Sequence, residues 1–378
     1  MPRRVNVWLL SAAAFSYMSG VGATLAVFPL AVKAAGGSDL DVGLVIGAWS
    51  LVYLLANVPA GVVLDRFGPS RLVPLGFALN VGVAALYMGG SIPLYLAGRG
   101  AEGVLEALIW TGVFGYTAKE NMESKLASFG TVYGSMALGF TLGPALGSLL
   151  YTALGPHSVF LFLAASSLLA GLAAWAALRG VGPAATAAGR PFWEALGGLR
   201  RPVALLSVAL ALLIGMFESN LVSYSPRIAA AMGLQETGGG YVISLYYLAS
   251  LASQFSLRFT ARLVESSLYP LAAYAALTAS LILFREGAWL GAAVAVAGIV
   301  DAASSSRVQA RLSTVLEGAE STAIGLGNAA WALGYTTGAP LHAALAPGVG
   351  AVEWLLVLAL AMLAVAAALS GAERGSRV

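Results

Sequence analysis

The chain of 378 residues contains no cysteine and only two histidines, His157 and His342. The lack of cysteine excludes a disulfide framework, a thiolate metal site and a cysteine nucleophile. Two histidines are too few for a histidine-based zinc cluster. We therefore expect no metal centre and no bound cofactor. An enzyme is not expected either, because no nucleophile–base constellation is evident.

Charged residues are also scarce. They make up 10% of the chain, whereas hydrophobic residues make up 59%. A soluble domain typically carries about 25% charged residues. A surface this poor in charge cannot face water on all sides, so its solvent must largely be lipid. The net charge of +3 is dispersed among the loops and does not indicate a nucleic-acid interface.

Apolar runs separated by short polar stretches predict an all-α membrane protein with twelve transmembrane helices, each needing about 20 mainly apolar residues. The first run follows two arginines, as in a signal peptide, but it is too long for one and is interpreted as an uncleaved span. The predicted spans are 5–32, 41–64, 72–90, 92–118, 126–151, 157–179, 203–229, 239–261, 268–284, 287–305, 320–345 and 350–370.

Lysine and arginine indicate the orientation of these spans, because cytoplasmic loops are enriched in both. With a cytoplasmic N-terminus, 16 basic residues lie inside, among them Arg307 and Arg311 in a predicted loop. Only 3 lie outside, namely Lys33, Arg227 and Arg285. We therefore predict a multi-pass protein of the cell membrane with both termini in the cytoplasm.

The two halves of the chain repeat one another. Arg66 and Gly139 recur as Arg262 and Gly334, at offsets of 196 and 195. Six spans return the chain to its starting side, so the repeats are parallel and are expected to form two six-helix bundles related by rotation about the membrane normal. We predict an N-terminal bundle at 1–179, a cytoplasmic linker at 180–202 and a C-terminal bundle at 203–378.

The loop after the second span resembles the Gly-x-x-x-Asp-Arg-x-Gly signature of the major facilitator superfamily. The matching residues are Gly61, Asp65, Arg66 and Gly68, and the basic residue that follows is Arg71. The resemblance implies a two-bundle transporter fold. Asp65 lies at the cytoplasmic end of its span, where a carboxylate can cap a helix N-terminus. We expect it to act as a gate latch on the start of span 11, around 320–323. The alternative is a tight turn whose charges only set topology.

Span 4 contains three charged residues, Arg99, Glu102 and Glu106. It resembles the superfamily's Arg-x-x-Gln-Gly pattern, with Glu102 in place of the Gln. Their spacing of i, i+3 and i+7 predicts one helix face. Glu106 lies roughly 22 Å into the membrane at 1.5 Å per residue. Because Arg99 is closer to Glu102, we expect Glu102 to stay charged and Glu106 to carry the proton. The alternative is a structural ion pair without a transport role.

Two further acids lie within predicted spans, Glu218 in span 7 and Asp301 in the inner part of span 10. Charges within a membrane are costly and usually functional, so both are candidate proton sites. Asp301 could instead extend toward the inner surface. Aromatic residues that could line a cavity, although each is more often a core residue, are Trp49, Tyr53, Trp110, Phe114, Phe217, Tyr246, Tyr247 and Trp331.

Span 5 has the spacing Gly-x8-Gly-x3-Gly-Pro-x2-Gly, formed by Gly130, Gly139, Gly143, Pro144 and Gly147. This pattern resembles the span-5 signature of the drug:proton antiporter branch of the superfamily. Small residues at every fourth position allow close helix packing. The proline removes one backbone hydrogen bond and bends the span. The alternative is generic glycine-rich packing.

Together, these patterns predict a monomeric secondary transporter that works by alternating access and exports small organic or amphiphilic compounds in exchange for protons. A symporter or uniporter that imports a small solute would share every feature except the span-5 pattern. A non-transporting receptor with this fold is a third interpretation, and the buried charges argue against it. The predicted partners are a small-molecule substrate, protons and the lipid bilayer.

Overall fold

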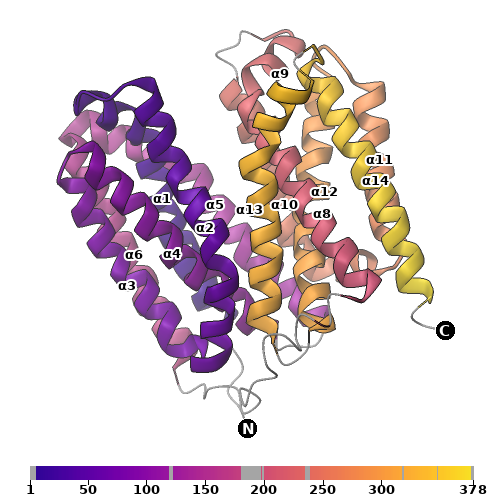
Figure 1. Cartoon of the computed structure of the whole chain (residues 1–378), viewed down its shortest axis with the longest axis horizontal. Coiled ribbons are helices and arrows are strands. Elements are labelled where there is room, and N and C mark those ends of the chain that lie inside the picture. Colours follow the sequence, from indigo (N-terminus) through magenta and orange to yellow (C-terminus); the bar gives the residue numbers. More distant parts are fainter. Residues whose placement is uncertain are drawn as a thin grey trace. The chain divides into compact units, whose positions relative to one another are not determined.

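The computed structural model describes residues 6–118, 122–179, 197, 200–234, 239–316, 319–346 and 348–375. The regular secondary structure of these residues is helical (Figure 1). The helices are α1 (Val7–Ala34), α2 (Asp39–Phe67), α3 (Pro69–Met88), α4 (Ile92–Thr117), α5 (Met122–Leu154), α6 (Pro156–Leu178), α8 (Pro202–Ser223), α9 (Ser225–Ala231), α10 (Gly239–Glu265), α11 (Tyr269–Leu283), α12 (Leu290–Val315), α13 (Glu320–Leu345) and α14 (Ala351–Gly375).

All of these helices except the short α9 correspond, in order, to the twelve predicted spans. Two predicted boundaries are wrong. The span predicted over 203–229 ends at Ser223, and Pro226, which has no N–H to donate, lies in the first turn of α9. The span predicted over 287–305 continues to Val315. Arg307 and Arg311 therefore lie in a helix and not in the predicted loop, because an acidic partner neutralises them there.

The chain divides into two compact units. The first consists of Met1–Lys119, Thr131–Arg190 and Gly318–Gly325. The second consists of Glu120–Gly130, Pro191–Glu317 and Leu326–Val378. The predicted linker at 180–202 falls almost entirely outside the described residues.

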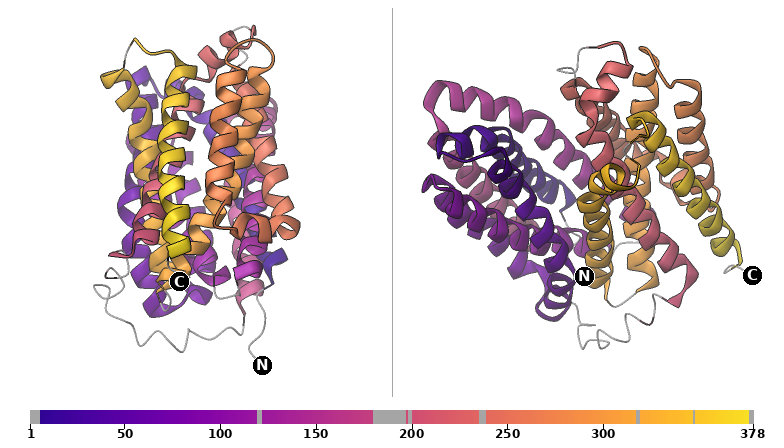
Figure 2. Two further views of the ribbon diagram at one scale, coloured as in Figure 1. Left: turned by 90° about the vertical axis from the view of Figure 1, so that its right-hand side faces the viewer. Right: turned by 45° about the horizontal axis from the view of Figure 1, so that its top comes forward.

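The same pairs of helices pack in each unit. In the first unit, α1 packs on α6, α2 on α4, and α3 on both α4 and α6. In the second unit, α8 packs on α14, α10 on α12, and α11 on both α12 and α14. Figure 2 shows the helices from two further directions. Helices in corresponding positions of the two halves thus have corresponding neighbours, as expected of repeated halves.

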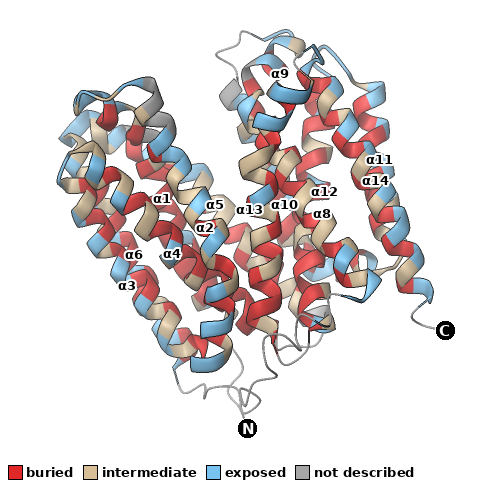
Figure 3. Ribbon diagram, viewed as in Figure 1, coloured by how far each residue is buried: buried red, intermediate tan, exposed pale blue. Residues whose placement is uncertain are grey.

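The outer surface of the helices is apolar. On α6, Leu161, Leu168, Leu172 and Trp175 are exposed, and their spacing places them on one side of the helix. Exposed residues lie opposite buried ones along the long helices of each unit (Figure 3). Seven of the described helices are long and apolar enough to cross a membrane. The chain is therefore a multi-pass membrane protein.

A capping box begins α2. The hydroxyl of Ser38 accepts the N–H of Asp41 at 3.2 Å, and Asp41 Oδ2 accepts the hydroxyl and the N–H of Ser38, each at 2.7 Å. The Ser38 hydroxyl, followed by the Ser38 N–H, lowers the pKa of the Asp41 carboxyl. The resulting negative charge lies in the first turn of α2, where it interacts favourably with the helix dipole.

Glycines of α5 bring its backbone against that of α1. A Cβ atom on Gly139 would lie 2.7 Å from Phe15 O, and one on Gly143 would lie 3.0 Å from Ala23 N. A Cβ atom on Gly338 of α13 would meet the backbone of α8 at 2.7 Å in the same way. Small residues thus allow close contact with the first helix of each half.

Candidate functional site

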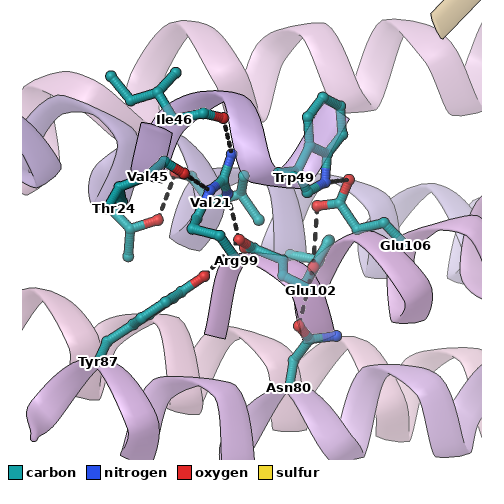
Figure 4. Close-up of polar contacts among 11 residues, drawn as sticks. Val21, Thr24, Val45, Ile46, Trp49, Asn80, Tyr87, Arg99, Glu102 and Glu106 are labelled. Carbon is teal, nitrogen blue, oxygen red and sulfur yellow. Dashed lines mark hydrogen bonds and ion pairs between the residues drawn. The ribbon is translucent and has the colours of Figure 1, made fainter. Parts of the chain in front are cut away.

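The three charged residues of α4 are buried on one face inside the first unit (Figure 4). The exposed fractions of Arg99, Glu102 and Glu106 are 2%, 0% and 2%. Arg99 forms an ion pair with Glu102. Its Nε also donates to Val45 O at 3.3 Å, and its Nη2 to Ile46 O at 3.5 Å. The buried guanidinium therefore has both a charge partner and hydrogen-bond acceptors, as burial of a charge requires.

Aromatic rings surround this ion pair. The Arg99 Cζ atom lies 5.4 Å from the ring centroid of Phe28 and 5.6 Å from that of Trp49, within the range of cation–π attraction. The Tyr87 hydroxyl donates to Glu102 Oε2 at 2.7 Å. The structure agrees with the prediction that Arg99 neutralises Glu102 in preference to Glu106.

Glu106 makes no ion pair within the described residues. Its Oε1 accepts the Tyr17 hydroxyl at 3.1 Å, and its Oε2 accepts the Trp49 indole N–H at 3.1 Å. The Tyr17 hydroxyl also lies 3.2 Å from Asn80 Oδ1. Because both donors are neutral, Glu106 can gain or lose a proton without breaking an ion pair.

Gly103 holds α2 against α4 between Arg99 and Glu106. A Cβ atom at Gly103 would lie 2.8 Å from Trp49 O and 3.0 Å from Tyr53 N, and both are backbone atoms. Only glycine permits this approach without a shift of the helices. The contact places the Trp49 side chain where its ring faces Arg99 and its N–H reaches Glu106.

The second unit contains a carboxylate with a similar set of donors. Glu218 on α8 accepts the Tyr247 hydroxyl of α10 at 2.8 Å and the Trp331 indole N–H of α13 at 2.9 Å. Glu218 is only partly buried, unlike Glu106. The ring of Tyr335 lies 5.2 Å from that of Trp331. The Glu218 carboxylate and the aromatic rings beside it are thus only partly buried, so a bound molecule could contact both.

Asp301 is buried on α12, 195 residues after Glu106. This offset equals that between Gly139 and Gly334, so the two acids occupy corresponding positions of the two halves. Ser305 donates to Asp301 Oδ1 at 3.4 Å, and Glu218 is near enough for electrostatic interaction. Neither Glu218 nor Asp301 makes an ion pair in the part of the chain that the structure describes. Like charges in a low dielectric favour uptake of a proton or a cation.

The expected contact of Asp65 with the start of α13 is present within the first unit. Asp65 Oδ1 accepts the Ser321 N–H at 3.1 Å, and Oδ2 accepts the Thr322 N–H at 2.9 Å and the Thr322 hydroxyl at 2.6 Å. A Cβ atom on Gly61 would lie 2.7 Å from Thr322 Cα. Asp65 therefore caps the N-terminus of α13, and Gly61 allows the close approach.

The other residues of this motif do not contribute to the cap. Gly68 ends α2 with a φ of 81°, which favours glycine. Arg66 and Arg71 are exposed, and the Arg66 guanidinium lies over the ring of Phe67. The motif thus consists of a helix cap, a helix stop and two exposed charges.

A second buried charge cluster lies on α12 and α14 and was not predicted. Arg307 Nη2 and Arg311 Nε contact Glu373 at 2.6 and 3.1 Å. Arg307 also donates to Val264 O, and Arg311 to Glu265 O at 2.9 Å. The two guanidinium groups therefore cap the C-terminal carbonyls of α10, a position that favours cations.

Several partners of the buried acids were not predicted from the sequence. Tyr17, Asn80 and Tyr87 were not among the predicted site residues, and Trp49 and Trp331 were named only as residues that could line a cavity. The one signal in the sequence was Asn80, a polar residue inside an apolar span, which indicates a buried hydrogen-bond partner. Among the described residues, no cluster of three or more His, Asp or Glu side chains could hold a metal ion.

Comparison with known proteins identifies the family. The family model described as "Major Facilitator Superfamily" matches residues 10–300. An uncharacterized MFS-type transporter of Methanocaldococcus jannaschii is 24% identical over 178 residues, or 47% of this chain and 46% of that protein. The quinolone resistance protein NorA of Staphylococcus aureus is 25% identical over 135 residues, or 35% of each chain. The chain thus spans less than half the length of these curated relatives.

Solved structures show the same fold over almost the whole chain. The fucose:proton symporter FucP of E. coli has a TM-score of 0.80 at 15% identity, covering 97% of this chain and 98% of FucP. The human organic anion transporter MFSD10 has a TM-score of 0.72 at 18% identity, covering 96% and 98%. With a fold of this kind and a family model that matches well over half of its length, the chain belongs to the Major Facilitator Superfamily, a family of membrane transporters and not of enzymes.

Proposed function

We propose that this transporter exports small organic or amphiphilic compounds in exchange for protons, by alternating access. The observation that carries the proposal is that each unit contains an acid held by neutral donors, Glu106 in the first and Glu218 in the second. A charge in a membrane is costly and is usually kept for function. A carboxylate without a fixed counter-charge is suited to binding and releasing a proton.

Glu106 is our first choice for the proton carrier. Glu102 already has Arg99 as its charge partner, whereas Glu106 is buried and, within the part of the chain that the structure describes, accepts only uncharged donors. Glu218 and Asp301 form a second acidic site. Because Glu218 lies next to Trp331 and its neighbour Tyr335, this site suits the positive charge of an amphiphilic compound. Protons can bind these same two carboxylates, so proton and substrate would compete for the negative charge of this second site, as exchange requires.

The direction of transport follows from the span-5 pattern. Gly139 and Gly143 pack against the backbone of α1, and Pro144 lies within α5. The resemblance of this pattern to drug:proton antiporters, together with the partial similarity to NorA, favours export. We further propose that the chain acts as a monomer with both termini in the cytoplasm, and that Asp65 serves as the latch of the cytoplasmic gate.

Transport into proteoliposomes tests the proposal. An antiporter accumulates its substrate in the more acidic compartment, whichever way the protein is inserted. We expect at least one member of a panel of organic cations and quinolones, with ethidium first, to accumulate when the lumen is acidic. Dissipating the gradient with an ionophore should abolish accumulation. Accumulation only when the outside is acidic would instead establish a symporter, and equilibration without any effect of the gradient would establish a uniporter.

A further inference from the structure

The hydroxyl of Tyr17 has two acceptors within reach. Glu106 Oε1 lies at 3.1 Å and Asn80 Oδ1 at 3.2 Å. A tyrosine hydroxyl has one hydrogen, so it donates to one of them at a time, and its oxygen can also accept. Tyr17 and Asn80 are fully buried and Glu106 is 2% exposed. The choice between the two acceptors is therefore made away from solvent.

The other oxygen of Glu106 has a fixed role. Oε2 accepts the indole N–H of Trp49 at 3.1 Å, and an indole N–H can only donate. Oε2 must therefore remain an acceptor whether Glu106 is ionised or protonated. A proton that binds the carboxylate is thereby directed to Oε1, the oxygen that faces Tyr17.

Asn80 is oriented to complete the arrangement. Its Nδ2 donates to Gly76 O at 3.0 Å, one turn earlier on α3. This bond turns Oδ1 toward Tyr17, so the acceptor available to the tyrosine is an amide oxygen that does not titrate near neutral pH. Helices α1, α3 and α4 each contribute one member of the chain Asn80–Tyr17–Glu106.

We propose that Tyr17 and Asn80 form a hydrogen-bond switch that receives the proton bound by Glu106. When Glu106 is ionised, Tyr17 donates to Oε1. When a proton binds Oε1, the new O–H donates to the Tyr17 oxygen and the Tyr17 O–H turns to Asn80 Oδ1. One proton is added to Oε1, the Tyr17 hydrogen bond moves from Glu106 to Asn80, and no other covalent bond changes. Every donor keeps an acceptor in both states, which avoids the cost of an unsatisfied buried group.

This inference rests on the proposed role of Glu106 as the proton carrier. The other groups that act on Glu106 electrostatically are Arg99 and Glu102 on α4 and Tyr53 on α2. Arg99 and Glu102 are paired with each other. The substitutions below leave all three in place, so their effect on Glu106 is the same in each variant.

An infrared titration of the purified protein tests the switch without a substrate. The carbonyl band of protonated Glu106 is identified as the band that Glu106→Gln lacks, and its amplitude is followed against pH. Tyr17→Phe removes a donor to the ionised form and an acceptor from the protonated form. Because a hydrogen bond to a charged group is the stronger of the two, the midpoint should rise, by about one pH unit. Asn80→Leu removes the acceptor that Tyr17 needs in the protonated form, so the midpoint should fall by about one unit. Leucine is close in volume to asparagine.

Midpoint shifts of opposite sign in Tyr17→Phe and Asn80→Leu distinguish a switch from a general loss of packing. A loss of packing would not be expected to raise the midpoint at one position and lower it at the other. The double variant should behave like Tyr17→Phe, because Asn80 has no role without the hydroxyl. Tyr246→Phe is the matched control, since that buried hydroxyl has no hydrogen-bond partner among the described residues, and it should leave the midpoint unchanged. Shifts in the same direction, or none, would overturn the inference.

Trp49→Phe provides a second test if Asn80→Leu does not fold. Loss of the N–H should raise the midpoint, and an unchanged midpoint would show that Oε2 is not held as an acceptor. The proposed function can be refuted independently of the hydrogen-bond switch. If Glu106→Gln still accumulates ethidium in acidic liposomes while the titration shifts as expected, the switch stands and Glu106 is not the proton carrier.

Discussion

Replacing Gly103 by alanine tests the contact that positions Trp49. The added Cβ atom would lie 2.8 Å from Trp49 O, 3.0 Å from Tyr53 N and 3.2 Å from the Cβ of Val52. The two nearest atoms belong to the backbone of α2 and cannot rotate away. The helices must therefore separate by a few tenths of an ångström or more, which lengthens the hydrogen bond from Trp49 to Glu106.

The expected magnitude follows from two opposing effects. Forcing an extra carbon into a well-packed interface typically costs about 1–3 kcal/mol. Replacing glycine by alanine inside a helix gains up to about 1 kcal/mol. We expect a net loss of stability of about 1–2 kcal/mol for Gly103→Ala. Gly100→Ala is the matched control on the same helix, because its Cβ atom would have a single neighbour, Val52 Cγ2 at 3.9 Å.

Thermal unfolding of the purified variants in detergent, followed by tryptophan fluorescence, measures the difference. Gly103→Ala should melt several degrees below the parent, whereas Gly100→Ala should melt at the same temperature or slightly above it. The infrared midpoint of Glu106 should rise in Gly103→Ala alone, because the Trp49 donor has moved away. If the two alanine variants had the same melting temperature, the close packing of α2 on α4 would be refuted.

Three further predictions concern the charged groups. Asp65→Asn removes the charge and one of the two accepting oxygens, so it should weaken the cap of α13 by about 0.3–1 kcal/mol. It should also increase labelling of cysteines engineered on the cytoplasmic side, in a chain without native cysteine, and unchanged labelling would rule out the latch. Glu106→Gln should abolish accumulation of ethidium in acidic proteoliposomes. Glu102→Gln restores the residue usual in the family and should reduce accumulation less. A greater loss in Glu102→Gln would show that Glu106 is not the proton carrier. Glu373→Gln should destabilise the protein by about 3 kcal/mol, because the buried Arg307 and the partly exposed Arg311 lose their charge partner. Glu353→Gln, at an exposed position, should leave the melting temperature nearly unchanged, and similar melting temperatures for the two variants would contradict the importance of the cluster.

Features that depend on local spacing and span order could be predicted from the sequence. The one-sided placement of Arg99, Glu102 and Glu106 follows from helix periodicity. The contact of Asp65 with the start of α13 was expected from the resemblance of its loop to the superfamily signature, together with the preference of a helix N-terminus for a carboxylate. Span ends alone would not have identified α13, because several predicted spans begin on the cytoplasmic side.

The partners of the buried acids could not be predicted in the same way. Tyr17 and Asn80 lie on α1 and α3, and nothing in their own spans tells which face packs on α4. Arg307 was assigned to a loop because the apolar run that defines the tenth predicted span ends at 305. Its pairing with Glu373, 66 residues later, stabilises the arginine within the helix and depends on tertiary packing.

The corresponding positions of Glu106 and Asp301 have a consequence for the electrical behaviour of transport. In the first half, Arg99 and Glu102 accompany the acid, but at the same offset of 195 the second half has Val294 and Ala297. The fourth helix of the second half has thus kept its acid and lacks both members of the ion pair. If Glu106 and Asp301 each release a proton for one monovalent cation, every cycle moves one net charge. The free energy that drives transport would then change by about 2.3 kcal/mol per 100 mV of membrane potential. If only one proton were exchanged per cycle, no net charge would move and the membrane potential would have no effect.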